Sequence, residues 1–469
     1  MTPNVLLIVA DQLRYDALGC SGNMTVRTPH LDRLAADGVC FEQAYSHIPI
    51  CSPARQSFLN GRRPEAFGGH WNYDLGPRVG TLSVDDYAWP RELRALGYRS
   101  VYAGKWNVHP HASPVQFGYD EYIPDSDHER WRAQKHPDVR YVGGYLGERD
   151  PLPLEDAATH FMAGRVADRI RTLFAQGSPW HVRLDFSAPH LPCRPAGRFA
   201  DLYRAQDMTP WGSFAETFAG KPYIQLQQLY SWGIENFTWE DFAPVVARYF
   251  GMVSQMDDAV GQVLQAVAQC GARDDTIVIF TADHGDLCGA HRMLDKHNVL
   301  YDDVVRVPLI IRWPAGLAAG VRVKEFVYNL LDVPPTLMEW LGTAPDAVWH
   351  GRSLATLLAG AAPKDWRNGV VATYHGQQCG LNTQRMIRTK RWKYIWNAMD
   401  VDELYDLRAD PHELVNRIDD PGLAQVVQGL RRQLYAELLA QGDRQVDNEW
   451  VRRQLLEGRK LGRRQSLSP

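Results

Sequence analysis

The chain has 469 residues, of which 45% are hydrophobic and 23% are charged, and its formal net charge is −4. Because positive and negative charges nearly balance, the chain lacks the strong excess of basic residues that binds nucleic acid or an anionic membrane, so neither partner is expected. The N-terminal segment lacks the basic start and long apolar stretch of a signal peptide, and no apolar run approaches the ~20 residues of a membrane span. A soluble, cytoplasmic protein is therefore expected.

The cysteines are scattered along the chain and odd in number, and they show no C-x-x-C spacing. They are Cys20, Cys40, Cys51, Cys193, Cys270, Cys288 and Cys379. This distribution argues against a disulfide framework and against a thiolate zinc site. Most of them are expected to be inert, buried thiols.

Strand and helix patterns alternate along most of the chain. Continuous apolar runs predict buried strands, and apolar residues at helical spacing closed by glycine predict helices. The expected elements are strand 5–10, helix 28–38, helix 89–96, strand 100–104, helix 157–174, strand 180–187, helix 242–269, strand 276–282 and strand 307–311. The alternation predicts an α/β fold with a large mixed, mostly parallel sheet flanked by helices.

The C-terminal part has a different pattern. Short strands at 385–389, 392–396 and 403–407 predict a small antiparallel sheet, followed by a helix at 423–439 and a basic, polar tail at 458–469. We therefore expect an α/β domain over residues 1–363 and a smaller C-terminal subdomain over residues 364–469.

Four polar residues each come directly after a predicted strand: Asp11, Lys105, His190 and Asp283. In parallel sheets, ligands bind beyond the carboxyl ends of the strands. The sequence therefore predicts that these four side chains belong to one site.

The segment that starts at Cys51 combines a thiol with a helix start. Ser52 can cap a helix, Pro53 suits its first turn and Gly61 marks its end. Cys51 would then lie at a helix N-terminus, where free N–H groups favour an anion, with Arg55 one turn later on the same face. An inert loop cysteine before an ordinary helix is the alternative, and these residues alone leave both open.

A second group of candidate ligands follows the strand at 276–282. Asp283 and His284 stand at a sharp turn, and Asp11 could share a metal ion with them. Two carboxylates and an imidazole suit Ca²⁺, Mg²⁺ or Mn²⁺ better than a thiolate-binding metal. The alternative is a structural turn with a helix cap.

Three further side chains could act on an anionic group. Lys105 and Lys296 could bind it, although most lysines are simply solvated. His190, which lies between two prolines, could serve as an acid or base, or could be an ordinary loop histidine.

Together these motifs resemble the formylglycine-dependent sulfatase family of the alkaline-phosphatase-like superfamily, over nearly the whole chain. The opening strand looks like the family's first strand, and Cys51-Ser52-Pro53-Ala54-Arg55 matches its Cys-x-Pro-x-Arg signature. The remaining motifs follow in the family's order: Lys105, Pro189-His190, Asp283-His284-Gly285, Lys296, residues 305–311, residues 403–407 and residues 410–413.

The resemblance implies that a separate formylglycine-generating enzyme oxidises Cys51 before folding is complete. The hydrated aldehyde would attack the sulfur of a sulfate ester. Arg55 would hold this nucleophile, Lys105 and Lys296 would neutralise the sulfate, and His190 would protonate the leaving oxygen.

The resemblance also implies one divalent metal ion, Ca²⁺ first and Mn²⁺ or Mg²⁺ as alternatives. Its expected ligands are Asp11, Asp283, His284 and the modified Cys51. Gln12 stands where many relatives carry a second carboxylate, so it is a further candidate ligand.

Besides Gln12, the chain departs from the family pattern at the Gly-Lys-x-His motif. Here Asn107 stands at the histidine position and His109 follows two residues later. Because this segment is a loop, a small excursion could bring His109 to the site, where it would accept the proton that triggers sulfate release. Either Asn107 or His109 alternatively lines the substrate pocket.

Three functions remain open from the sequence. The first is sulfate ester hydrolysis, with a carbohydrate sulfate suggested by the similarity of residues 57–64 to uronate sulfatases. The second is hydrolysis of phosphonate monoesters or phosphodiesters by the same groups, and the third is a catalytically silent binding protein. Substrate specificity is expected from the segments 111–151 and 199–240, which are rich in Trp, Tyr and Arg.

Overall fold

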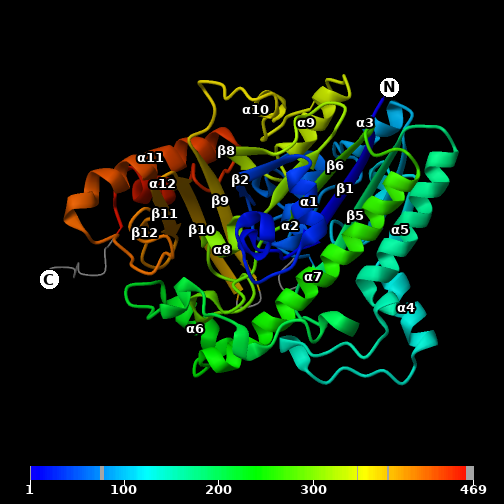
Figure 1. Cartoon of the computed structure of the whole chain (residues 1–469). Helices are drawn as coiled ribbons and strands as arrows, with labels where there is room; N and C mark the ends of the chain where they lie inside the picture. The colour runs from blue at the N-terminus through cyan, green and yellow to red at the C-terminus, as the bar shows by residue number, and fades with distance from the viewer. Residues whose placement is uncertain (1, 74–78, 346, 378–379, 461–469) are drawn as a thin grey trace.

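A computed structural model describes residues 2–73, 79–345, 347–377 and 380–460. Its main feature is an eight-stranded sheet with helices packed around it (Figure 1). The end of the predicted basic tail and Cys379 lie outside the described residues. No helix in the described part of the chain is long and apolar enough to cross a membrane.

The large sheet has the strand order β4-β3-β5-β1-β6-β7-β2-β8. In chain order the strands are β1 (Asn4–Asp11), β2 (Val39–Tyr45), β3 (Arg99–Gly104), β4 (Glu121–Pro124), β5 (Trp180–Pro189), β6 (Thr276–Ala282), β7 (Leu309–Arg312) and β8 (Val321–Tyr328). Only β7 runs antiparallel to its neighbours among these pairings. The predicted mixed, mostly parallel sheet is confirmed.

The central strands are apolar because helices cover them. Val5 to Ala10 of β1 are at most 1% exposed, as expected for a strand buried on both faces. The longest helices, α5 (Ala158–Ala175) and α7 (Trp239–Gln269), pack against each other beside the sheet (Figure 1). The other main helices are α1 (Pro29–Ala36), α2 (Cys51–Asn60), α3 (Pro90–Ala95), α4 (Ser126–Lys135), α6 (Tyr223–Trp232) and α9 (Val333–Trp340).

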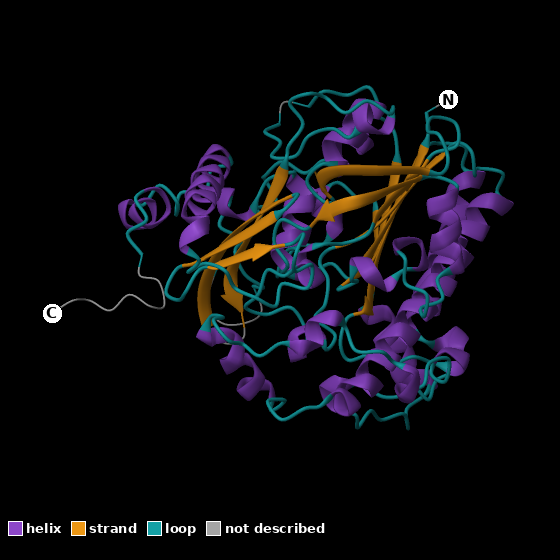
Figure 2. Ribbon diagram, turned by 60° about the vertical axis from the view of Figure 1, so that its left-hand side comes forward, coloured by secondary structure: helices purple, strands orange, loops and turns teal. Residues whose placement is uncertain are grey.

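The C-terminal part forms a second, four-stranded antiparallel sheet in the order β12-β11-β10-β9 (Figure 2). Its strands are β9 (Gly369–Gln377), β10 (Gly380–Thr389), β11 (Trp392–Asn397) and β12 (Glu403–Asp406), with α11 (Ala424–Ala440) packed on them and α12 (Glu449–Leu456) next to α11. The small antiparallel sheet is confirmed. The proposed boundary at residue 363 stays a prediction.

The register of the central strands brings the predicted strand-end residues to one edge. Strands β3, β5, β1 and β6 are consecutive and parallel, with Gly104 opposite Asp185, Asp11 opposite Pro189, and Ala10 opposite Ala282. Residues that follow these strands therefore share the carboxyl edge of the sheet, where α/β folds bind ligands.

Candidate active site

Helix α2 presents Cys51 at the carboxyl edge of the sheet. The helix begins at Cys51 itself, since Ile50 is extended (φ −135°, ψ 130°), and it ends at Gly61, whose φ of 72° suits a residue without a side chain. Cys51 is 2% exposed, so its thiol sits in a closed environment. The predicted helix start and stop are both present.

The expected capping role of Ser52 is wrong. The N-terminus of α2 has no side-chain cap, because the Ser52 hydroxyl instead donates to Oδ1 of Asn107 at 2.8 Å. The backbone N–H of Ser52 donates to Oδ1 of Asn72 at 2.9 Å. Two asparagines from separate loops therefore surround the start of α2.

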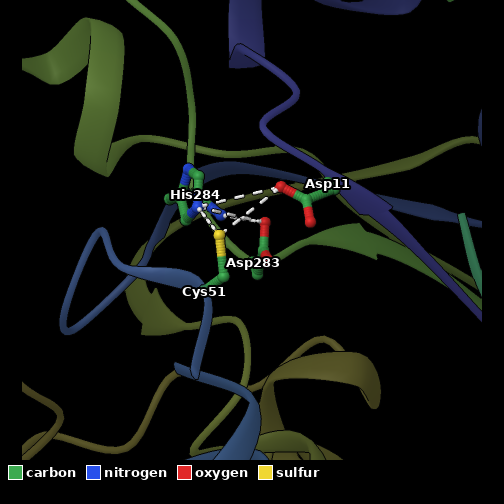
Figure 3. A group of neighbouring side chains, drawn as sticks. All are labelled: Asp11, Cys51, Asp283 and His284. Carbon is green, nitrogen blue, oxygen red and sulfur yellow. Dashed lines mark hydrogen bonds and ion pairs between the residues drawn. The ribbon is translucent and has the colours of Figure 1, made fainter. Parts of the chain in front are cut away.

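Four side chains form a compact group of potential metal ligands: Asp11, Cys51, Asp283 and His284 (Figure 3). One ligand atom from each lies within 4.8 Å of all the others, and the Cys51 sulfur is 3.3 Å from Nε2 of His284. All four are buried. Two carboxylate oxygens and one imidazole nitrogen fit a hard or borderline divalent cation, which would compensate the negative charge gathered here.

Arg55 joins the carboxylates at the base of the site. Its guanidinium donates to Asp283 at 3.0 Å, to Asp185 at 2.6 Å and to Asp11 at 3.1 Å, and all four side chains are fully buried. Burial disfavours the charge of Asp11, but Lys105, His190 and Arg55 hold its pKa well below the usual value. The Asp11 carboxylate is therefore kept ionised, and the hydrogen bonds from Arg55 hold the three carboxylates in place.

Two lysines and a histidine lie above this base. Lys105 forms an ion pair with Asp11, whose charge raises the lysine pKa despite burial. Lys296 donates to Oε1 of Gln12 at 2.6 Å and lies 2.9 Å from Nε2 of His190. The three predicted strand-end and loop groups Lys105, His190 and Lys296 thus lie around the same centre.

These cations also change the acidity of the thiol. Burial and Asp11 oppose ionisation of Cys51, but Lys105, Lys296 and His284 outweigh them and hold the pKa of Cys51 well below its usual value. A centre that stabilises negative charge at this position can also bind a tetrahedral anion.

The Gln12 side chain is held from both ends. Its amide oxygen accepts from Lys296, its amide nitrogen donates to Asp286, and its backbone has a φ of 66°. The structure thus gives Gln12 a role in orienting Lys296, and its role as a metal ligand stays a prediction.

The loop after β3 directs Asn107, rather than His109, toward α2. The ring of His109 lies 6.2 Å from that of Phe117, and its Nδ1 accepts from the backbone of His111 and Ala112. These interactions lie within its own loop. In this structure the turn engages the His109 imidazole and Asn107 bonds to Ser52, and the proton-accepting role of His109 stays a prediction.

Sequence reasoning missed four residues of the site: Asn72, Asp185, Tyr145 and Asp295. Asp185 had a detectable signal, since it is a carboxylate in a strand whose residues are almost all buried. Tyr145 donates to Asp295 at 3.0 Å and its ring is 4.9 Å from that of Trp232, so both expected specificity segments reach the site. Nothing local to the loop around Asn72 indicates its contact with α2.

The comparisons with known proteins agree with this geometry. The family described as Sulfatase matches residues 3–343, and the family described as N-sulphoglucosamine sulphohydrolase, C-terminal, matches residues 289–440. An arylsulfatase of Clostridium perfringens is 28% identical, over 93% of this chain and 95% of its own length.

Two further proteins are similar over most of the chain. An N-acetylglucosamine-6-O-sulfatase of Bacteroides thetaiotaomicron is 24% identical, over 88% of this chain and 82% of its own length. The crystal structure of a phosphonate monoester hydrolase of Agrobacterium radiobacter superposes with a TM-score of 0.80 at 27% identity, covering 94% of this chain and 96% of the other.

Proposed function

The chain belongs to the sulfatase family of sulfuric ester hydrolases, and we propose that it cleaves a sulfate monoester into an alcohol and inorganic sulfate with a nucleophile derived from Cys51. One observation carries this proposal: Cys51 starts helix α2 inside the Asp11, Asp283 and His284 group, with two lysines beside it. That arrangement combines a nucleophile position with charges that stabilise a sulfuryl group.

Conversion of Cys51 to formylglycine by a separate generating enzyme during maturation is part of the proposal. Its support is the intact Cys-x-Pro-x-Arg motif and the placement of the thiol at the start of α2. One hydroxyl of the hydrated aldehyde would bond to sulfur as the ester S–O bond breaks, and the alcohol oxygen would leave with a proton. Loss of the second hydroxyl proton would then form the C=O bond as the C–O bond to sulfate breaks, which releases sulfate and restores the aldehyde.

A divalent metal ion fits the donor set described above. Asp11, Asp283, His284 and the modified Cys51 would hold it, Gln12 is a further candidate, and Ca²⁺ is expected before Mn²⁺ or Mg²⁺. When bound, the ion would polarise a sulfate oxygen and favour the ionised nucleophile. Elemental analysis of active protein would identify the ion.

The remaining side chains have distinct proposed roles. Arg55 would orient the nucleophile, while Lys105 and Lys296 would bind the sulfate oxygens. The Nδ1 of His190 faces the carbonyl of Leu191 at 2.5 Å, so Nδ1 carries a hydrogen and Nε2 is the atom available to move a proton. That nitrogen lies beside the Lys296 ammonium, and we assign it the transfer of a proton to the leaving oxygen when it carries one.

The alternative activity is hydrolysis of phosphonate monoesters or phosphodiesters. Its support is the similarity to the Agrobacterium phosphonate monoester hydrolase. We expect nitrophenyl sulfate to be cleaved with a kcat/KM at least roughly tenfold above that of a phenyl phosphonate ester, about 1.4 kcal/mol in transition-state binding. The measurement is a side-by-side rate comparison on protein produced together with a generating enzyme. A reversed preference would favour the phosphonate activity.

A catalytically silent binding protein is the third alternative. It would retain cysteine at position 51, so intact-mass analysis for the formylglycine side chain separates it from an enzyme.

A carbohydrate sulfate is the proposed substrate class, supported by the similarity to the N-acetylglucosamine-6-O-sulfatase and by the two aromatic segments at the site.

The loop after β3 yields a paired prediction. We expect Asn107→Ala to lower kcat/KM roughly tenfold, because a lost hydrogen bond to Ser52 would loosen the start of α2. We expect His109→Ala to change it less than about twofold, because that ring is engaged within its own turn. Steady-state kinetics on nitrophenyl sulfate measure both, and each variant serves as a control for the other. A larger loss of kcat/KM in His109→Ala than in Asn107→Ala would support His109 as the proton acceptor.

A further inference from the structure

A cavity of about 530 Å³ adjoins the catalytic groups at the carboxyl ends of β3 and β5. Its wall includes Lys105 and His190, which also belong to the catalytic centre, and residues of α4 and of the first turns of α5. A volume of this size suits a small organic ligand such as a sugar ring. The cavity is therefore placed to receive the part of a substrate that lies beyond its sulfate.

The wall of this cavity contains two guanidinium groups that share one aromatic ring. The Arg194 guanidinium carbon lies 4.1 Å from the centre of the Tyr141 ring, and that of Arg132 lies 5.5 Å from it. Tyr141 is itself held by a hydrogen bond from its hydroxyl to Asp150 at 3.0 Å. The stacking orients both guanidiniums while leaving their N–H groups free.

Neither guanidinium has a hydrogen-bond acceptor in the part of the chain that the structure describes. Nε of Arg194 is buried without a partner, and its carboxylate neighbour, Glu148, remains 3.9 Å away. No carboxylate of a described residue lies within 4.0 Å of Arg132. Nε of Arg194 is thus an unsatisfied buried donor, and the other N–H groups of both arginines are available to an acceptor that enters the cavity.

The carboxylates of the cavity wall do not accept hydrogen bonds from Arg132 or Arg194. Asp185 is bonded to Arg55 and Arg183, Asp125 accepts from the Ser126 backbone, and Asp150 accepts from Tyr141. Glu129 is exposed, so it lies in solvent at the rim. The two arginines are therefore the cationic groups of the wall that have no hydrogen-bond acceptor among the described residues.

We propose that this cavity binds the alcohol part of the substrate and that Arg132 and Arg194 bind a second anionic group on it, a sulfate or a carboxylate. The inference rests on the proposed sulfatase function and names its substrate class: sulfate esters of an alcohol with a further negative charge. Guanidinium forks match the planar or tetrahedral oxygens of such groups and add charge-assisted hydrogen bonds.

The test uses aryl sulfates that carry a carboxylate on arms of increasing length, each paired with its neutral carboxamide. For at least one arm length, the wild-type kcat/KM is expected to favour the carboxylate roughly 10- to 100-fold, as expected for hydrogen bonds to a charged group. Arg132→Gln and Arg194→Gln should each reduce this preference at least roughly fivefold. Because the preference is a ratio measured within one variant, partial misfolding does not alter it.

Two matched variants remove nearby positive charges that do not face the cavity. Arg130→Gln on α4 removes a guanidinium paired with Asp127, and Arg198→Gln removes one paired with Asp258. Both should retain the wild-type preference. A wild-type enzyme without a carboxylate preference at any arm length would overturn the inference, as would equal losses in control and test variants. If no aryl sulfate is cleaved at all, the result contradicts the proposed sulfatase function, on which this inference rests.

Discussion

Replacing Cys51 with alanine should abolish sulfate ester hydrolysis and leave the fold intact. The residue supplies the nucleophile in the proposed mechanism, and no other described side chain can replace an atom that forms a covalent bond to sulfur. We expect kcat/KM to fall by at least ~10⁴-fold, the scale seen when a covalent nucleophile is removed. Turnover of nitrophenyl sulfate measures the loss, and circular dichroism with thermal unfolding measures the fold.

The matched control is Cys270→Ala. Cys270 caps the end of α7, away from the catalytic groups, and it is half-buried. This variant should keep turnover within about twofold, since substitutions away from special contacts usually have small effects. A Cys51→Ala enzyme that retains wild-type turnover would exclude Cys51 as the source of the nucleophile.

The second large effect concerns stability. Replacing Arg55 with methionine should lower the free energy of unfolding by about 3–5 kcal/mol, because it leaves buried carboxylates without their shared cation. Asp11, Asp185 and Asp283 all bond to Arg55, and every one of these side chains is fully buried. Urea denaturation of metal-free wild type and variant measures the difference, and it should be accompanied by loss of turnover.

An exposed arginine provides the comparison for this prediction. The Arg33 side chain is 76% exposed and pairs with Asp37, the residue directly after α1, so Arg33→Met should leave the free energy of unfolding close to the wild-type value. An Arg55→Met variant as stable as Arg33→Met would mean that the three carboxylates are neutralised in another way, for example by protonation.

The sequence predicted the sheet and its active edge because both depend on local patterns. A continuous apolar run such as β1 must be buried on both faces, so it indicates a central parallel strand with a polar residue after it. Four such strands end at Asp11, Lys105, His190 and Asp283, and their parallel register places these residues together. The edge strands β4 and β8 and the neighbouring strand β2 were missed, because their shorter or more polar segments carry weaker patterns.

The start of α2 was only partly predictable. Pro53 and Gly61 mark the helix limits through their own backbone preferences, so the position of Cys51 at its N-terminus followed from the sequence. The partner of Ser52 did not follow, because a hydroxyl can bond to the helix or to another loop. Contact with Asn107 depends on where the loop after β3 passes.

By itself, the sequence determined the fold class and the polar residues at the catalytic edge, since these follow from local spacing and hydrophobic pattern, and its motifs carried the resemblance to the family. Only the tertiary structure decided which partners those residues have: Arg55 joins two carboxylates on β1 and β5 with a third just after β6, and Gln12 connects Lys296 to Asp286. It also decided that Arg132 and Arg194 meet on Tyr141 beside Lys105. Such contacts depend on loop paths and side-chain orientations between residues far apart in the chain, and no local pattern encodes them.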